Sequence, residues 1–349
     1  MSVVRSTSTV QIDCMPKEAT RPVTLQHIAL QAGVSVSTAS RALARHPSIS
    51  EETRELVLRI ARESNYDIKR RQGVDQNQIT VVMAVPAVSS HMAEPFHLRL
   101  LGGIGSAMRE RHIDFSISHR VPRGDESLTE FMGAYPHGGF IFLGQSQYHE
   151  ALNKFCKQGR ALAVWGAQLE DQTYCSIGTD NFFGGQRATS HLLRLGRKRI
   201  AFLGACPVVE IEQRLAGYKA ALENHGVALD NALIQHTKLI YDSGFEAVND
   251  LMDRGVKFDG IVATSDMLAI GAMRALSMHG MTVPGDVSII GYDDIDVASY
   301  SSPALTTIRQ DVLKAGHLLV TKVLRQLSGH NSPSERLQTD LIVRGSCGG

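Results

Sequence analysis

The pattern of apolar residues changes character at about residue 79, and this change limits the possible folds more than any other feature. Before it, short helical patterns follow one another closely. After it, short apolar runs alternate with amphipathic stretches of roughly 10–15 residues, which predicts parallel sheets with crossover helices. Residues 79–349 are too many for one such lobe. We therefore expect a small all-α head and a two-lobed α/β core, with helices on both faces of its sheets.

The segments of the predicted core follow from this alternation. The apolar runs predict strands at Ile79–Val85, Ile113–His119, Gly139–Leu143, Ala161–Trp165, Arg199–Gly204, Gly260–Ala263 and Val287–Tyr292. The amphipathic stretches predict helices at Leu98–Arg111, Gly184–Leu195, Arg214–His225, Gly244–Arg254 and Met267–His279.

The head contains three predicted helices, each preceded by a hydroxyl residue that can cap it. Thr24 precedes Leu25–Gln31, and Ser35 precedes a helix that reaches about Leu43. Ser50 precedes Glu51–Ser64, whose first turn is acidic, as the helix dipole favours. Their apolar positions predict one small core made of Leu25, Ile28, Ala29, Val34, Leu43, Leu56, Ile60 and Tyr66.

Composition shifts divide the chain into four parts. Residues 1–20 form a polar leader, in which Met15 is an alternative start. Residues 21–68 form the helical head, 69–78 a charged linker and 79–349 the core.

The charge is distributed unevenly between head and core. Residues 21–73 hold nine Lys and Arg against five Asp and Glu, whereas residues 74–349 hold 25 against 28. A basic head on a slightly acidic body indicates a polyanionic partner for the head alone.

Several classes of protein are disfavoured. No apolar run has the roughly 18–20 residues of a membrane span, and residues 1–22 lack a secretory signal, so we expect a cytoplasmic protein. The five cysteines are scattered without a C-x-x-C pair, which predicts free thiols and no metal or cofactor.

An α/β enzyme is the alternative function from another class of protein. However, Gly103-x-Gly105-x-x-Met108 falls inside a predicted helix, and no hydrolase or nucleotide-binding motif is present.

The segment Val23–Leu43 has the spacing of a helix-turn-helix. Ala29 is small where two helices would cross, Gly33 suits the turn and Val34 would fill the space between the helices. The second helix opens with hydroxyl residues that can reach phosphates, and Arg41 follows.

This segment, continued through Ser50, Thr53 and the Asn65-Tyr66 pair, resembles the headpiece of the lactose repressor (LacI) family. The resemblance implies that Val36, Ser37 and Arg41 face bases in the major groove. It implies contacts to the DNA backbone from Thr24, Ser35, Thr38, Ser40, Ser50, Thr53 and Tyr66. Arg41 can donate twice to one guanine, while Val36 can make only apolar contacts.

One segment departs from the family pattern. Members usually follow the Asn-Tyr pair with Pro-Asn and an Ala-Arg-x-Leu hinge helix, whose leucine enters the minor groove. Here the sequence reads Asp67-Ile68-Lys69-Arg70-Arg71-Gln72-Gly73. The departure leaves the minor-groove contact open, and Lys69–Arg71 would contact the DNA backbone instead.

The resemblance extends over most of the core. It is carried by Gly178-Thr179-Asp180-Asn181, Arg214-Leu215-Ala216-Gly217-Tyr218, Ser265-Asp266-Met267, Gly291-Tyr292-Asp293-Asp294 and Leu305-Thr306-Thr307-Ile308. It implies a core like a periplasmic sugar-binding protein, with three crossover strands. It also implies a homodimer on pseudo-palindromic operator DNA, and a repressor rather than an activator. Without an export signal, and with a DNA-binding head, a periplasmic protein is disfavoured.

Six polar or aromatic residues are candidates for the ligand site, because ligands of such folds bind at strand ends between lobes. Asp293, Ser265 and Trp165 end or follow predicted strands, Asp180 begins the second lobe, and Arg214 opens a helix. The resemblance adds His97 and assigns Arg214 and Asp293 to sugar binding. These groups suit a mono- or disaccharide. The pair Trp165-Gly166 also resembles the purine repressor, so a purine remains an alternative ligand. A purely structural role also remains open for Asp293, Trp165 and His97.

Overall fold

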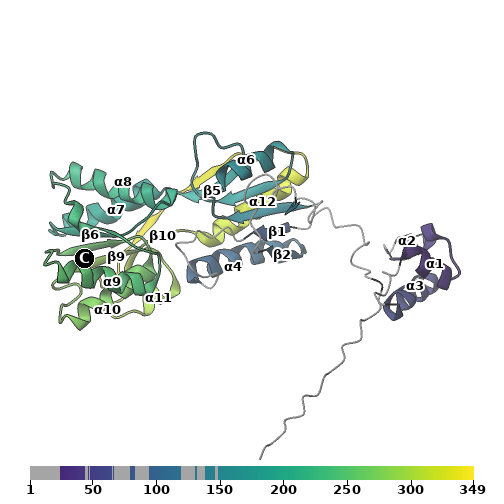
Figure 1. Cartoon of the computed structure of the whole chain (residues 1–349), viewed down its shortest axis with the longest axis horizontal. Helices are drawn as coiled ribbons and strands as arrows, with labels where there is room; N and C mark the ends of the chain where they lie inside the picture. Colours follow the sequence, from purple (N-terminus) through teal and green to yellow (C-terminus); the bar gives the residue numbers. More distant parts are fainter. Residues whose placement is uncertain are drawn as a thin grey trace, which may run out of the picture. The chain divides into compact units, whose positions relative to one another are not determined.

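The computed structural model describes residues 24–43, 46, 48–64, 66, 79–82, 94–118, 130–131, 138–145 and 148–349 (Figure 1). Contacts divide the chain into two compact units, Met1–Val74 and Asp75–Gly349, here called the head and the core. The expected leader, the linker 69–78 and the basic triplet Lys69–Arg71 lie outside the described residues.

The head consists of α1 (Leu25–Gln31), α2 (Val36–Leu43) and α3 (Glu51–Glu63). The three predicted caps are present. Each hydroxyl oxygen accepts a hydrogen bond from a backbone N–H three residues later, at 3.4 Å for Thr24, 3.1 Å for Ser35 and 3.4 Å for Ser50. Gly33 makes the turn between α1 and α2 with a φ of +67°.

Small side chains bring the three helices of the head together. The fully buried members are Leu25, Ile28, Ala29, Ala32, Ala39, Ala42, Leu43, Val57 and Ala61. Val34, Ile60 and Tyr66 pack against them as predicted. The prediction that Leu56 belongs to this core was wrong: the buried face of α3 runs through Val57 and Ala61, four residues apart, and Leu56 is not among the partly buried residues that pack against it.

The first lobe of the core is built on a fully parallel sheet. Its strands are β1 (Ile79–Val82), β2 (Phe115–Ser118), β3 (Gly139–Leu143), β4 (Leu162–Trp165), β5 (Cys175–Thr179) and β11 (Glu335–Leu337), in the order β11-β5-β4-β3-β1-β2. Alternate strand residues point to opposite faces. One face packs against α4 (Pro95–Glu110) and α12 (Val312–Leu327), and the other against α6 (His149–Lys157).

The second lobe repeats this plan. Its strands are β6 (Ile200–Ala205), β7 (Ile234–His236), β8 (Gly260–Ala263), β9 (Ser288–Asp293), β10 (Thr306–Arg309) and β12 (Asp340–Ile342), in the order β12-β10-β9-β8-β6-β7. Its helices are α7 (Asn181–Arg194), α8 (Val209–Asn224), α9 (Tyr241–Asp253), α10 (Asp266–Met278) and the short α11 (Asp296–Tyr300). Helices α7 and α8 cover one face, and α9 and α10 the other (Figure 1). Within this sheet β12 runs antiparallel to β10.

The two lobes are not contiguous segments of the chain. Within residues 148–349, all of which are described, the chain crosses between lobes after β5, after β10 and between β11 and β12. The structure therefore has the three crossings that the resemblance implied, and the predicted fold class is confirmed.

The structure extends the predicted set of elements. Each predicted strand and helix of the core has a counterpart, with ends shifted by a few residues in several cases. Strands β5, β7, β10, β11 and β12 and helices α6, α11 and α12 were not predicted.

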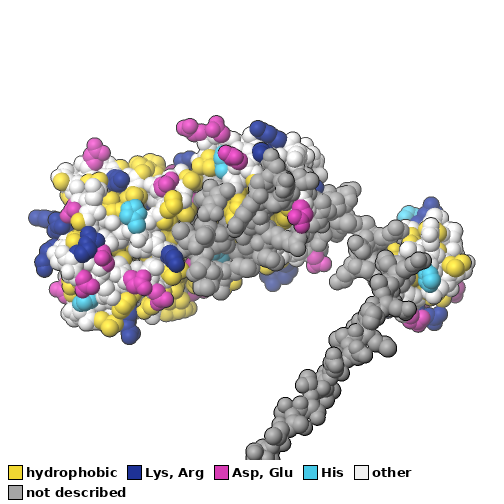
Figure 2. All heavy atoms as spheres, in the orientation of Figure 1, with side chains coloured by type: hydrophobic (Ala, Val, Ile, Leu, Met, Phe, Trp, Pro, Cys, Tyr) yellow, Lys and Arg dark blue, Asp and Glu magenta, His cyan; other side chains and the backbone are white. Residues whose placement is uncertain are grey.

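No helix among the described residues has the length and apolar character needed to cross a membrane. On the visible face of the core, basic and acidic side chains are interspersed, as is usual for a solvated surface (Figure 2).

Glycines allow paired helices to approach closely. A Cβ on Gly185 of α7 would lie 2.2 Å from the carbonyl oxygen of Arg214, and one on Gly217 of α8 would lie 2.0 Å from that of Phe182. The pairs Gly103–Gly316 (α4 and α12) and Gly244–Gly271 (α9 and α10) are similarly tight. Each helix pair thus meets backbone to backbone at its glycines.

We expect Gly217→Ala to destabilise the core by about 1–3 kcal/mol, because the added methyl group has no room and the helices must separate. The midpoint of thermal unfolding should fall accordingly. Gly102→Ala is the matched control: it lies within α4 with no atom within 4 Å of the new Cβ, so it should be neutral or stabilising. Equal midpoints for the two variants would contradict the close-contact interpretation.

Candidate functional site

The exposed face of α2 is the first candidate site. Ala39, Ala42 and Leu43 are buried in the head, whereas Val36, Ser37, Ser40 and Arg41 form a continuous exposed stripe. The spacing of these four residues places them on one side of the helix. This face offers a guanidinium, two hydroxyls and an apolar side chain in a form that can enter a DNA major groove.

The other predicted DNA-contacting residues surround the helix N-termini. Ser35 Oγ lies 2.8 Å from Thr38 Oγ1, and Ser50 Oγ lies 2.9 Å from Thr53 Oγ1. Thr24, Ser35 and Ser50 begin the three helices, where backbone N–H groups and the helix dipole favour a phosphate. Tyr66 is half-buried against the core of the head.

A cavity within the core is the second candidate site. It has a volume of about 110 Å³, against the roughly 10–15 Å³ that one water requires. His97, Trp165, Arg214, Ser265 and Asp293 line it, as the prediction of a ligand site requires. The lining residues that were not predicted are Glu94, Phe96, Leu143, Gly144, Val208, Glu210, Ile211, Leu239, Thr264 and Gln310.

Asp180 is the predicted ligand residue that does not belong to this lining. It is the N-cap of α7, where its Oδ1 accepts from the N–H of Phe183 at 3.1 Å. Its other carboxylate oxygen lies 3.6 Å from Arg336. The residue follows a strand end, but the helix that begins there uses its side chain.

Arg214 forms the buried part of the cavity wall in the second lobe. It lies within α8, which begins at Val209, so the expectation that Arg214 opens this helix was wrong. Its Nε donates to Asn181 Oδ1 at 2.9 Å and its Nη1 to the carbonyl of Thr264 at 2.6 Å. The guanidinium carbon lies 3.6 Å from the centre of the Tyr292 ring, a cation–π contact.

Asp293 is the last residue of β9, one residue beyond the predicted end of that strand. Its Oδ1 accepts from Gln310 Nε2 at 2.7 Å. Burial raises the pKa of Asp293 to about 7, while Arg214 and the hydrogen bond from Gln310 act in the opposite direction. The neighbouring Asp294 points elsewhere and accepts from Arg344 Nη2 at 2.5 Å.

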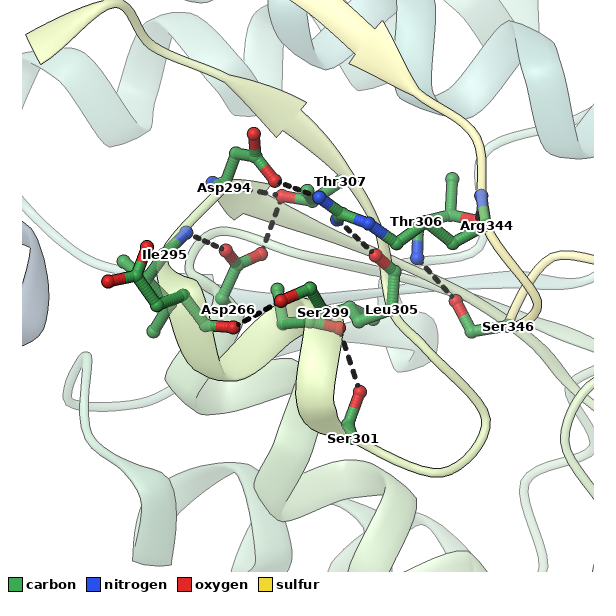
Figure 3. A network of polar contacts seen from close by, with 12 residues as sticks. Asp266, Asp294, Ile295, Ser299, Ser301, Leu305, Thr306, Thr307, Arg344 and Ser346 are labelled. Carbon is green, nitrogen blue, oxygen red and sulfur yellow. Dashed lines mark hydrogen bonds and ion pairs between the residues drawn. The ribbon is translucent and has the colours of Figure 1, made fainter.

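A buried network holds this turn in place (Figure 3). The backbone φ angles of Asp293 and Asp294 are +113° and +55°. Residues other than glycine rarely adopt such positive φ angles. Below them, the fully buried Asp266 accepts from Thr307 Oγ1 at 2.5 Å and from the N–H of Ile295 at 2.9 Å. Burial and Asp293 raise the pKa of Asp266 well above its usual value. The network was not predicted, because its members are brought together only by the fold.

The first lobe contributes aromatic rings and a second carboxyl group. The rings of Phe96 and Trp165 lie 5.9 Å apart, and Phe96 contacts His97 edge-on at 5.5 Å. Burial lowers the pKa of His97 to about 4, so its ring is neutral. Burial, and then Asp293, raise the pKa of Glu94 to about 7. The rings provide an apolar wall beside polar groups.

Two buried polar atoms of this wall have no hydrogen-bond partner. They are Glu94 Oε1 and His97 Nδ1, and the His97 nitrogen lies 3.7 Å from Glu94 Oε2, too far for a hydrogen bond. Buried polar atoms are normally paired. Both atoms belong to residues that line the cavity, so this wall holds polar groups that the contacts of the chain leave unsatisfied.

Polar contacts of described residues join the lobes beside the cavity. Glu210 of α8 accepts at Oε1 from the N–H of Ala167, which follows β4, at 3.0 Å. Arg99 of α4 donates to the carbonyl of Asp294 and lies 3.8 Å from the carboxylate of Asp296. Among the described residues, no group of three His, Cys, Asp or Glu side chains is placed to hold a metal ion.

Comparisons with known proteins match both parts of the chain. Residues 24–67 match the model of bacterial regulatory proteins of the lacI family, and residues 189–347 match that of periplasmic binding protein-like domains. The HTH-type transcriptional regulator CelR of Thermobifida fusca is 32% identical over 343 residues, which span 94% of this chain and 99% of CelR. The HTH-type transcriptional regulator AscG of Escherichia coli is 31% identical over 342 residues, or 93% of this chain and 98% of AscG. Both relatives are regulators, which confirms the prediction of a regulator rather than an enzyme.

Solved structures give the same result. A CelR–cellobiose complex matches with a TM-score of 0.67 and 28% identity, covering 93% of this chain and 100% of that one. A lac repressor dimer bound to operator and the anti-inducer ONPF matches with a TM-score of 0.72 and 26% identity, covering 94% of this chain and 99% of that one.

The raised pKa of Glu94 predicts a pH-dependent contribution to stability. Its pKa is about 7 in the folded chain against a usual 4.5, so the folded state binds more protons between these values. Its contribution is fully present below about pH 4.5 and is lost as pH rises through about 7. We expect the melting midpoint of Glu94→Gln, relative to wild type, to rise between pH 5 and pH 8. The lowered pKa of His97 makes stability depend on pH in the opposite direction, but it does so in both proteins and cancels in the difference between their melting midpoints. A difference that stays constant between pH 5 and pH 8 would contradict the prediction.

Proposed function

The chain belongs to the LacI family of bacterial regulatory proteins, and on this premise we propose that it represses transcription from an operator, with an affinity that a small sugar alters. The observation that supports this most directly is the combination of two sites in one chain. The exposed stripe of α2 suits a DNA groove, and the core holds a cavity with unpartnered polar atoms.

In this proposal α2 reads the operator. Arg41, Val36 and Ser37 face the bases, with Arg41 donating to a guanine. The backbone contacts come from Thr24, Ser35, Thr38, Ser40, Ser50, Thr53 and Tyr66, which position the head without reading sequence. Because operator DNA lies in the bacterial cytoplasm, this proposal also makes the protein a cytoplasmic one.

A mono- or disaccharide is the effector that the cavity suits best. The Phe96 and Trp165 rings can cover the apolar face of a sugar ring, while Asp293, Arg214, Ser265 and His97 offer partners to hydroxyl groups. The relative CelR has been solved with cellobiose. A purine remains the second candidate, because a nucleobase can also stack on Trp165.

We propose that the protein acts as a homodimer, since two heads would recognise two half-sites of a palindrome. The core exposes large apolar side chains that suit self-association. Tyr300 and Val297 of α11 are 81% and 43% exposed, and Leu98 of α4 is 52% exposed.

Arg41→Ala should weaken specific operator binding by roughly 1–3 kcal/mol, about 5- to 150-fold, because a bidentate base contact is lost. The operator would first be selected from genomic fragments, and affinities then measured by fluorescence anisotropy against a scrambled duplex. Arg59→Ala on exposed α3 removes the same charge and should retain the preference for the operator. Equal losses of specificity in both variants would remove Arg41 from the base-reading role.

Asp293→Asn should abolish most of the stabilisation by the effector and leave operator binding without effector intact. Asn has the shape of Asp and, like Asp, adopts positive φ more readily than most residues, so we expect folding to be retained. A thermal-shift screen against mono- and disaccharides and purines identifies the effector, since saturation at 100 times Kd adds about 2.7 kcal/mol. Asp253→Asn, on the exposed surface of α9, is the matched control. An unchanged thermal shift in Asp293→Asn would place the ligand elsewhere.

A further inference from the structure

We propose that Glu94 makes the cavity selective for uncharged sugars over their anionic counterparts, an inference that rests on the proposed sugar-binding function. The carboxyl group of Glu94 faces the cavity from the first lobe, and Asp293 faces it from the second. A ligand between them must satisfy both carboxyl groups.

The charged groups of the lining favour donors over anions. Among the described lining residues, Glu94, Glu210 and Asp293 are acidic, and Arg214 is the basic residue that is charged near neutral pH. The charge of Arg214 is already opposed by Asp293, and two of its nitrogens donate to Asn181 and Thr264. An anionic ligand would therefore meet carboxyl groups without a dedicated cation.

Among the described residues, Glu94 differs from the other two acids in that its carboxyl group accepts no hydrogen bond. Glu210 accepts from the N–H of Ala167, and Asp293 accepts from Gln310. Glu94 Oε1 has no partner, and neither has the neighbouring His97 Nδ1. A sugar hydroxyl can donate to the Glu94 carboxyl group, whereas a carboxylate ligand has no proton to donate and is repelled by Glu94 once this residue is ionised.

This selectivity should depend on pH. The charged or titratable groups around Glu94 are His97 on its own helix, and Asp293, Glu210 and Arg214 from the second lobe; Arg99 acts on Asp293. His97 stays neutral above about pH 4. Glu94 and Asp293 both ionise as pH rises through about 7, so the repulsion of an anionic ligand grows over that range.

The test compares sugars with their acids on the full-length protein. Calorimetric titration at pH 6 and pH 8 would use glucose and glucuronate, galactose and galacturonate, and cellobiose and cellobionate. We expect the neutral member of the bound pair to bind at least about tenfold tighter, a difference of 1.4 kcal/mol, with a wider ratio at pH 8. Glu94→Gln should narrow this ratio several-fold and flatten its pH dependence. Affinity for the neutral sugar is measured in the same titrations, so that the ratio separates a change in selectivity from a general loss of binding.

Glu246→Gln removes the same charge from the exposed surface of α9 and should leave the ratio unchanged. An acid that binds as tightly as its neutral sugar would overturn the inference and leave the proposed function standing. The inference would also be overturned if Glu94→Gln left the ratio of the two affinities, for the neutral sugar and for its acid, unchanged. If no sugar of either class binds while operator binding is retained, the proposed sugar effector fails, and the inference with it. The pH comparison on the wild-type chain tests whether ionisation of the cavity carboxyl groups sets the ratio, and Glu94→Gln then assigns the effect to Glu94, because Asp293 titrates over the same range.

Discussion

The ligand cavity depends on how closely α7 and α8 approach each other. Their backbones meet at Gly185 and Gly217, and a side chain at either position would collide with the carbonyl of the facing helix. This contact brings Arg214 of α8 within hydrogen-bonding distance of Asn181 of α7 and over the ring of Tyr292. The guanidinium is therefore fixed by three elements of the second lobe before any ligand is present, which reduces the cost of ordering it on binding.

The turn after β9 shows how the second lobe supports an unfavourable backbone conformation at its binding site. Two consecutive aspartates have positive φ angles, and such residues persist only where the surroundings hold them. Asp266 and Thr307 bind this turn from below, and Arg344 binds the carboxylate of Asp294. Asp293 is thereby directed into the cavity while Asp294 is directed away, so two adjacent carboxylates serve different purposes.

The fold class, the helix caps and five residues of the cavity lining could be predicted from the sequence, because each of these rests on local patterns. Hydroxyls before helices and apolar alternation are visible in a single sequence, and strand ends in α/β folds converge on one edge. Short strands such as β7 and β11, with three residues each, carry too little pattern to be recognised. Glu94 and Gln310 were missed because they lie beside the cavity only through contacts between distant segments. Asp180 met the strand-end criterion, yet the local need of α7 for a cap determined its role.

The repeated crossing of the chain between lobes has a consequence for its synthesis. The first lobe, which begins near residue 79, needs α12 and β11 from residues 312–337 to cover α4 and complete its sheet. During translation α4 therefore leaves the ribosome long before its packing partner exists, and its apolar face must wait for the last part of the chain. The three helices of the head pack on one another within residues 24–66, so this unit can fold as soon as it emerges. A nascent chain would thus carry a formed DNA-binding head before it has a core able to respond to an effector.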